Sequence, residues 1–497
     1  TEYFVLTEGL RFLLLFFFFQ NNNEELSFWE QLKKTIVCYL PYAGVIIGYA
    51  VYRFFLFESI FGIVNNNDIV VLSAILQGDL GALADFAQHI LQDTYAMLLS
   101  PFNKMYDPEV IEAKSYFALS VGMGIFIVFI LVLTFNAKKQ TLKKQDMWQF
   151  AVFGVAGLLL GALPIWLMDR QSFVGLWSDR FLMAPMVGIA ILYAALLLWL
   201  SKGSRPGMIV LSVLIGFSLM FQIQNSYRYQ QNWEQQRSLY WQLHWRLPAL
   251  EEDTMVLNTN TPLSYLSNYA VGIALNHMYE EGRHTEQPNY WFVNVTRTFS
   301  METAKKLTAD EKVSFDVRTL HVEGELDQVV AFVNDSKEKV CLRIIDEPYN
   351  QFGDFSKFSY VEQNLYHLSA PDKWVIEDEE REMPENIFGK EPSHDWCYYF
   401  QKQDLARQQE DWQSVISLYD EARSLGLRSK WGWEYIPILT AYATTEDWEA
   451  FEAVSNEIIG LSIPKHFNQF INYIDQHAPP SATKDEVISR VLESYEY

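Results

Sequence analysis

The sequence predicts an α-helical polytopic membrane bundle of about six spans, followed by a soluble α/β domain and a tetratricopeptide-like helical-repeat carboxy-terminal part. Three observations predict this fold class: long apolar runs in the first half, an uneven charge, and strand and helix patterns that give way to repeated helices. Residues 1–224 hold 16 acidic and 14 basic residues, whereas residues 225–497 hold 45 and 24. This split argues against a single soluble globule. The net charge of −23 argues against a nucleic-acid partner, because an acidic surface repels phosphate.

Six stretches have the length and apolarity of spanning helices, which makes membrane lipid the first expected partner. They cover residues 3–19, 36–57, 115–135, 148–167, 181–200 and 207–224. The first stretch follows Thr1 almost directly, with no basic region or cleavage site before it, so it does not resemble a signal peptide. We interpret the chain as a fragment, or a processed form, of a longer protein.

The basic residues of the loops predict the orientation of these spans. Loops 20–35, 136–147 and 201–206 carry eight Lys or Arg, and the alternate loops 58–114 and 168–180 carry four. Loops rich in Lys and Arg remain in the cytoplasm. We therefore expect both termini of this chain on the non-cytoplasmic side of a cell or inner membrane.

Residues 78–100, between the second and third spans, form an amphipathic pattern. Apolar residues recur at helical spacing, while Asp85, His89 and Asp93 mark the other face. We expect an outer helix that lies on the membrane surface or re-enters it; a full span is the alternative. The polar face is expected to be solvated, although its side chains would also suit a metal ion or an acceptor.

Residues 225–247 are expected to continue the last span as a membrane-exit helix, because no proline interrupts this stretch. Residues 248–395 then alternate strand and helix patterns, which predicts an extracytoplasmic α/β domain. Strands are expected at 255–260, 290–299, 313–324, 329–334 and 340–345, the last two forming a hairpin, and a helix at 262–280. The acidic run 377–382 is expected to be a solvated linker.

Residues 396–497 contain an internal repeat. The tripeptide Glu-Asp-Trp at 410–412 recurs at 446–448, an offset of 36 residues, and each copy is expected to follow one helix and begin another. A helix–turn–helix unit of this length is typical of tetratricopeptide-like repeats. A structural cap is the favoured role, and a docking surface for a protein partner is the alternative.

The three cysteines do not form a metal-binding pattern. Cys38 lies in a predicted span, and Cys341 and Cys397 lie in the outer part, with no CxxC or Cys/His ligand spacing, so we expect no metal site. The outer location would permit a Cys341–Cys397 disulfide, but free thiols are favoured. No Walker loop, GxGxxG or GxSxG motif occurs, so the cofactor and the catalytic residues stay unassigned.

Charged residues inside or beside the first span form the first candidate site. Glu8 and Arg11 lie three residues apart, so they share a helix face and can pair, and Glu2 lies just outside the same helix. Charges at this depth rarely face lipid. They are expected either to line a functional cavity or to form an ion pair that locks helix packing, and the sequence does not separate these alternatives.

Arg170 and Arg180 flank the outer loop between the fourth and fifth spans and form the second candidate site. An arginine at the membrane edge can bind a lipid-linked phosphate through its planar set of donors. Ordinary snorkelling, with Asp179 as a local partner of Arg180, is the favoured alternative when these residues are considered alone.

The run SDRFLMAPMVGIAILYAALLLWL, residues 178–200, resembles the Arg-aromatic…Pro start of a late helix in membrane glycosyltransferases of the GT-C type. The opening TEYFVLTEGLRFLLLF is similar to a Glu-Tyr-Phe…Glu-x-x-Arg helix of large bacterial members of that group. Several spans followed by an outer domain with tetratricopeptide-like helices also resembles their layout.

This resemblance implies transfer of a sugar from a polyprenyl-phosphate donor at the outer leaflet. It implies that Arg180, with Arg170, contacts the donor phosphate, and that Glu2, Glu8, Arg11 and Asp179 line the cavity. The catalytic acidic residue of that group belongs to a loop that would precede Thr1, so none is assigned in this chain. The alternative function is a non-catalytic membrane scaffold whose outer domains bind a protein partner.

Overall fold

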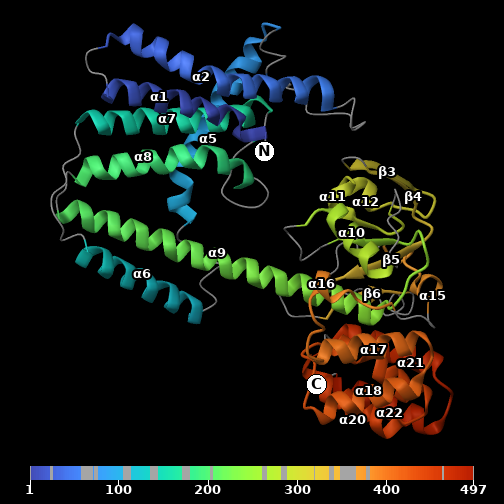
Figure 1. Cartoon of the computed structure of the whole chain (residues 1–497). Helices are drawn as coiled ribbons and strands as arrows, with labels where there is room; N and C mark the ends of the chain where they lie inside the picture. Colours follow the sequence, from blue (N-terminus) through green and yellow to red (C-terminus); the bar gives the residue numbers. More distant parts are fainter. Residues whose placement is uncertain are drawn as a thin grey trace. The chain divides into compact units, whose positions relative to one another are not determined.

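The computed structural model divides into two compact units, residues 1–230 and 231–497, each described by itself below (Figure 1). The structure describes residues 2–22, 26–57, 71, 77–104, 114–134, 144–168, 170, 179–201, 205–259, 266–280, 288–317, 320–334, 341–346, 365–376, 381–461 and 464–495. Most of these residues are helical, and the second unit holds a small mixed sheet.

The first unit is built from helices. They are η1 (Glu2–Glu8), α1 (Gly9–Asn22), α2 (Phe28–Val51), the π-helical turn η2 (Tyr52–Leu56), α5 (Leu80–Lys104), α6 (Lys114–Thr134), α7 (Lys144–Leu167), η4 (Asp179–Leu182), α8 (Met183–Ser201) and the first part of α9 (Arg205–Arg246). In the part of the chain that the structure describes, three stretches are long and apolar enough to cross a membrane: Phe4–Asn22, Phe28–Val51 and Met147–Leu167. The apolar parts of α6 and α8 are shorter. Membrane association is therefore supported, whereas the predicted six spans are not confirmed.

Helices α7 and α8 pack closely because glycines face each other between them. A Cβ atom added at Gly188 would lie 2.2 Å from the backbone nitrogen of Leu158, and one at Gly161 would lie 2.5 Å from that of Pro185. Neither position can therefore carry a side chain without moving the backbone. Small residues of this kind allow close helix packing in membranes, where lipid provides no hydrophobic drive for association.

The second unit contains a four-stranded sheet in the order β2-β1-β5-β6. The strands are β1 (Met255–Asn258), β2 (Trp291–Asn294), β5 (Val329–Val333) and β6 (Arg343–Ile345). Strand β1 is parallel to β2 and β5, and β6 is antiparallel to β5, as the predicted hairpin required. Helix α10 (Asn268–Tyr279) connects β1 to β2. All four residues of β1 and of β2 are buried, as expected for parallel strands covered on both faces.

Two of the predicted strands differ in the structure. The predicted strand 290–299 ends at Asn294, whose side chain caps the short helix α11 (Val295–Thr298) by accepting the backbone N–H of Arg297. The predicted strand 313–324 is an antiparallel pair, β3 (Lys312–Val317) and β4 (Leu320–Glu325). Both runs are rich in β-branched and apolar residues, and this pattern does not reveal a cap or a tight turn within them.

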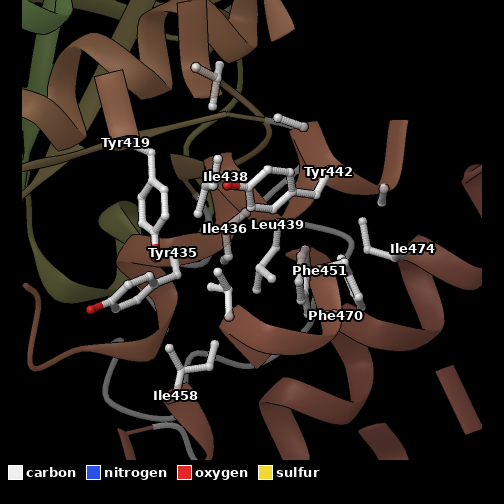
Figure 2. Packing of buried hydrophobic residues seen from close by; sticks show 14 of the residues in the cluster. Tyr419, Tyr435, Ile436, Ile438, Leu439, Tyr442, Phe451, Ile458, Phe470 and Ile474 are labelled. Atoms are coloured by element: carbon white, nitrogen blue, oxygen red, sulfur yellow. The ribbon is translucent and has the colours of Figure 1, made fainter. Parts of the chain in front are cut away.

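The rest of the second unit is helical. Its elements are α12 (Met301–Ala304), α15 (Pro371–Trp374), α16 (Glu385–Phe388), α17 (Trp396–Gln408), α18 (Trp412–Ser424), η5 (Gly432–Tyr435), α19 (Ile436–Thr444), α20 (Trp448–Ile458), η6 (Ile459–Leu461), α21 (Pro464–His477) and α22 (Ala482–Tyr495). Helices α17 to α22 share one aromatic and aliphatic core, in which Tyr435, Leu439 and Phe451 are fully buried (Figure 2).

The two Glu-Asp-Trp tripeptides form turns of the same geometry. Glu410 and Glu446 have φ of 57° and 60°, which ends the preceding helix, and each following aspartate caps the next helix. Asp411 accepts the backbone N–H of Ser414, and Asp447 accepts that of Ala450, both at 3.1 Å. This recurrence is local to the turns, and the assignment to tetratricopeptide repeats remains a prediction.

A buried network of four charges joins the end of α9 to the sheet and to α17. The Arg246 Nε donates to Asp404 at 2.7 Å, and the Arg407 Nε donates to the other oxygen of Asp404 at 2.8 Å. Arg407 also pairs with Asp346, the residue after β6. Burial opposes ionisation of Asp404, but two guanidiniums outweigh it and lower its pKa to about 2. Burial raises the pKa of Asp346, and its pairing with Arg407 only partly offsets this.

Asp404→Asn is expected to destabilise the second unit by about 3–5 kcal/mol, because it leaves Arg246 and Arg407 buried without their shared carboxylate. The free energy of local opening, measured by amide hydrogen exchange in α17 of the solubilised full-length chain, checks this. The control is Glu452→Gln, which breaks a pair with Arg490 whose side chain is 46% exposed; it should cost about 1 kcal/mol or less. Equal effects of the two variants would contradict the argument.

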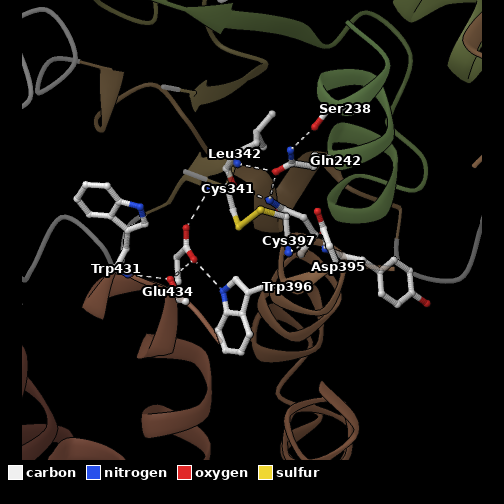
Figure 3. The surroundings of a disulfide bond; sticks show 12 residues. Ser238, Gln242, Cys341, Leu342, Asp395, Trp396, Cys397, Trp431 and Glu434 are labelled. Carbon is white, nitrogen blue, oxygen red and sulfur yellow. Dashed lines mark hydrogen bonds between the residues drawn. A yellow bond between two sulfur atoms is a disulfide. The ribbon is translucent and has the colours of Figure 1, made fainter. Parts of the chain in front are cut away.

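A disulfide joins Cys341, just before β6, to Cys397 in α17, so the expectation of free thiols is wrong (Figure 3). The folded chain brings the Cα atoms of these residues within 5.2 Å across 56 positions, a proximity that no sequence spacing indicated. Closing a loop of this length stabilises a fold by about 4 kcal/mol in the chain-entropy model. The bond therefore fixes the sheet to the first helix of the helical part.

Glu434 lies beside this disulfide and is 2% exposed. Its carboxyl group accepts the backbone N–H of Cys341 at 3.0 Å and the Trp396 indole N–H at 2.7 Å (Figure 3). It also pairs with the Ser429 hydroxyl. Burial raises its pKa from the ordinary 4.5 to about 7, because its hydrogen bonds only partly offset desolvation. Glu434 thus connects the sheet, α17 and the 429–435 loop through one titratable group.

The raised pKa of Glu434 predicts a pH-dependent stability. Below pH 4.5 the group is protonated in the folded and unfolded states alike; between about pH 4.5 and 7 only the unfolded state loses its proton. Its contribution to stability is therefore complete below pH 4.5 and falls by about 3 kcal/mol as the pH rises to 7. Amide exchange of α17 and α19 across this range checks the slope.

Glu434→Gln should be less stable than the natural chain at low pH but should lack this downward slope, since an amide does not titrate. An identical slope in both proteins would assign the pH dependence to another group.

Candidate functional site

One end of the first unit gathers the charged residues that the sequence singled out. Helix α1 runs antiparallel to α7, because Asn21 at its far end hydrogen-bonds Gln149 near the start of α7 at 3.0 Å. Helix α8 also runs antiparallel to α7, with Gly188 against Gly157. Both η1 and η4 contact α7 and α8. The starts of α1 and α8 and the end of α7 therefore lie at the same end of this bundle.

Glu8 and Arg11 form the predicted ion pair. The Arg11 Nε donates to Glu8 at 2.8 Å, and its guanidinium lies 4.4 Å from the ring centroid of Tyr42 in α2. The two side chains are 41% and 44% exposed, so the pair lies at the surface of the helix pair α1–α2. This geometry fits the packing alternative. That Glu8 and Arg11 line a cavity remains a prediction.

Arg170 and Arg180 are both exposed at this end of the bundle. The Arg180 guanidinium lies 4.9 Å from the Phe181 ring centroid, while Phe181 itself is buried. Among the described residues, neither arginine forms an ion pair. Asp179 and Glu2 begin η4 and η1, and their side chains lie outside what the structure describes.

Helix α5 places a carboxylate and an imidazole inside the bundle. Asp93 is 1% exposed and accepts the Trp166 indole N–H of α7 at 3.1 Å. The His89 Nε2 lies 3.7 Å from the same carboxylate, and His89 is 9% exposed. The expectation of a solvated polar face is therefore wrong for His89 and Asp93, although Asp85 is exposed.

The apolar residues of α5 divide between the surface and the bundle. Leu80 and Leu91 are 80% and 70% exposed, whereas Met97, one turn beyond Asp93, is fully buried against α7 and α8. Exposed leucines on the same helix as a buried carboxylate suit a helix that contacts lipid, because the leucines can meet hydrocarbon while Asp93 finds its partner within the bundle.

The buried pair and Arg180 belong to neighbouring elements. Trp166, the hydrogen-bond donor to Asp93, packs in one apolar cluster with Phe86 and Ile90 of α5 and with Leu182 of η4. An imidazole backed by a carboxylate is an arrangement that can accept a proton, and a free guanidinium can neutralise a phosphate. One end of the bundle thus offers both functions, without a metal cluster of His, Cys, Asp or Glu in the described residues.

Sequence reasoning missed the role of Trp166. The signal was a tryptophan at the end of an apolar helix, three residues before Asp169, where an indole N–H needs a polar partner. Its partner lies 73 residues away, so the pairing became visible only in the folded chain.

Comparison with known proteins adds no further assignment. No family model, curated protein or solved structure matches this chain.

Proposed function

We propose that the chain is part of an integral-membrane glycosyltransferase of the GT-C type that takes a polyprenyl-phosphate-linked sugar at the outer leaflet. In this proposal it has about six spans, and both of its termini lie on the non-cytoplasmic side. The observation that carries the proposal is that the exposed Arg170 and Arg180 and the buried His89–Asp93 pair belong to neighbouring elements of the first unit.

The chemistry of sugar transfer requires this combination. The departing lipid phosphate needs cationic neutralisation, and the acceptor hydroxyl needs a group that takes its proton. Arg180, with Arg170, would supply the first requirement at the depth of lipid headgroups. The His89–Asp93 pair would supply the second, because a carboxylate 3.7 Å from the imidazole nitrogen stabilises the charged form of the ring.

The disulfide in the second unit supports the proposed orientation. Disulfides persist in oxidising compartments and are rare in the cytosol. The Cys341–Cys397 bond therefore favours placement of the second unit outside the cytoplasm, in agreement with the positions of the basic loops. The matching turns at 410–412 and 446–448 likewise support tetratricopeptide-like repeats in its helical part.

Arg180→Ala is expected to weaken binding of a polyprenyl phosphate to the solubilised full-length chain at least tenfold, because it removes a charge-assisted contact with the phosphate. Native mass spectrometry with decaprenyl phosphate, and with uncharged decaprenol as competitor, measures this. Lys34→Ala, at an exposed lysine near the start of α2, provides the matched control and should bind normally.

Equal binding of decaprenyl phosphate and decaprenol, or equal binding by the Arg180→Ala and Lys34→Ala variants, would contradict a phosphate site. That result would favour the non-catalytic membrane scaffold, and Arg180 would then be a snorkelling anchor.

A further inference from the structure

We propose a saccharide-binding pocket in the second unit, at the end of α10, that accepts neutral or amino-bearing sugars. The structure contains a cavity of about 440 Å³ between the last turn of α10 and residues 381–387. This volume lies within the range of about 300–1,000 Å³ typical of small-molecule sites. The pocket lies within one unit and goes beyond the proposed transferase function.

The walls of the cavity carry both hydrogen-bond acceptors and donors. Glu280 and Glu382 supply carboxylates, Arg381 a guanidinium, His277 an imidazole and Asn386 an amide. Sugar hydroxyls donate and accept at once, so neighbouring hydroxyls can bridge a carboxylate and a cationic or amide donor. A wall that alternates these groups suits a polyhydroxylated ligand.

Two of these side chains belong to a fixed framework. Glu280 accepts the backbone N–H of Asn289 at 3.2 Å, which leaves its second oxygen available. The backbone N–H of Arg381 donates to Pro248 at 3.1 Å, which fixes the chain that carries both Arg381 and Glu382. The position of Arg381 and Glu382 is thus set by the fold, although the acidic run to which they belong was expected to be only a solvated linker.

The cavity also has apolar groups. Pro384 and Ile387 provide surface against which the C–H groups of a sugar ring can pack. Met278 and Tyr279, at the same end of α10, are each 2% exposed and anchor that end of the helix in the core of the second unit.

The surrounding charge selects against anionic ligands. Glu280 and Glu382 place two carboxylates in the cavity wall. The carboxylates of Glu251, Glu252 and Glu280 also raise the pKa of nearby Tyr290, and the Arg381 guanidinium lowers it. Together with burial, this environment raises the pKa of Tyr290 to about 12. A phosphate or uronic acid would meet this negative field, whereas a neutral or amino sugar would not.

Saturation-transfer NMR on the solubilised full-length chain tests the pocket. The probes are mannose, N-acetylglucosamine and glucosamine, with glucuronic acid as the anionic comparison. At least one of the first three should bind, and glucuronic acid should not. The double variant Glu280→Gln and Glu382→Gln should bind at least tenfold more weakly, because amides form weaker hydrogen bonds than carboxylates. Glu449→Gln, an exposed site on α20, is the matched control.

Arg381→Met is a second variant with the same expected loss, and unchanged amide exchange in α10 verifies that each variant is folded. Absence of binding by all three sugars, equal binding by the variants and the control, or binding of glucuronic acid would overturn the proposal. Because the readout is sugar binding at the second unit, its outcome is independent of lipid-phosphate binding at Arg180.

Discussion

The second unit depends on a buried carboxylate that two arginines share. Asp404 lies between Arg246, at the end of α9, and Arg407 of α17. Arg407 also pairs with Asp346, the residue that follows β6. Four charges with almost no solvent access are tolerable only if every one is paired, so the three elements that carry them must meet in one arrangement. The Cys341–Cys397 disulfide and Glu434 add a second connection between the sheet and the helices. Glu434 hydrogen-bonds Cys341, just before β6, and Trp396 of α17.

The first unit also contains a buried carboxylate that is paired, here among the apolar side chains of a helical bundle. Asp93 is stabilised by the Trp166 indole, and close glycine contacts between α7 and α8 hold that indole in place. A buried carboxylate and imidazole are costly in a helical bundle, and such groups usually mark a functional site in a membrane protein. The neighbouring exposed arginines give this site its proposed partner, a lipid-linked phosphate.

The sequence predicted most elements but few of their long-range partners. Apolar length located the helices, short apolar runs located β1, β5 and β6, and the Glu-Asp-Trp recurrence located two helix caps, because these signals are local. The Glu8–Arg11 pair was also accessible, since it depends on helical spacing. The long-range contacts were not accessible from the sequence. The disulfide joins residues 56 positions apart, the Trp166–Asp93 hydrogen bond spans 73 positions, and the Arg246–Asp404 pair spans 158. The polar residues of α5 suggested a helix face in contact with water, whereas His89 and Asp93 are buried and Asp93 is hydrogen-bonded to Trp166 of the bundle.

The proposed placement of the second unit outside the cytoplasm can be tested through the redox state of its two cysteines. Intact cells that express the chain are quenched in acid, denatured and treated with a maleimide-linked polymer, which adds mass to each free thiol. We expect one adduct, at Cys38, before reduction and three adducts after reduction. Three adducts before reduction would show Cys341 and Cys397 as free thiols and would contradict the orientation.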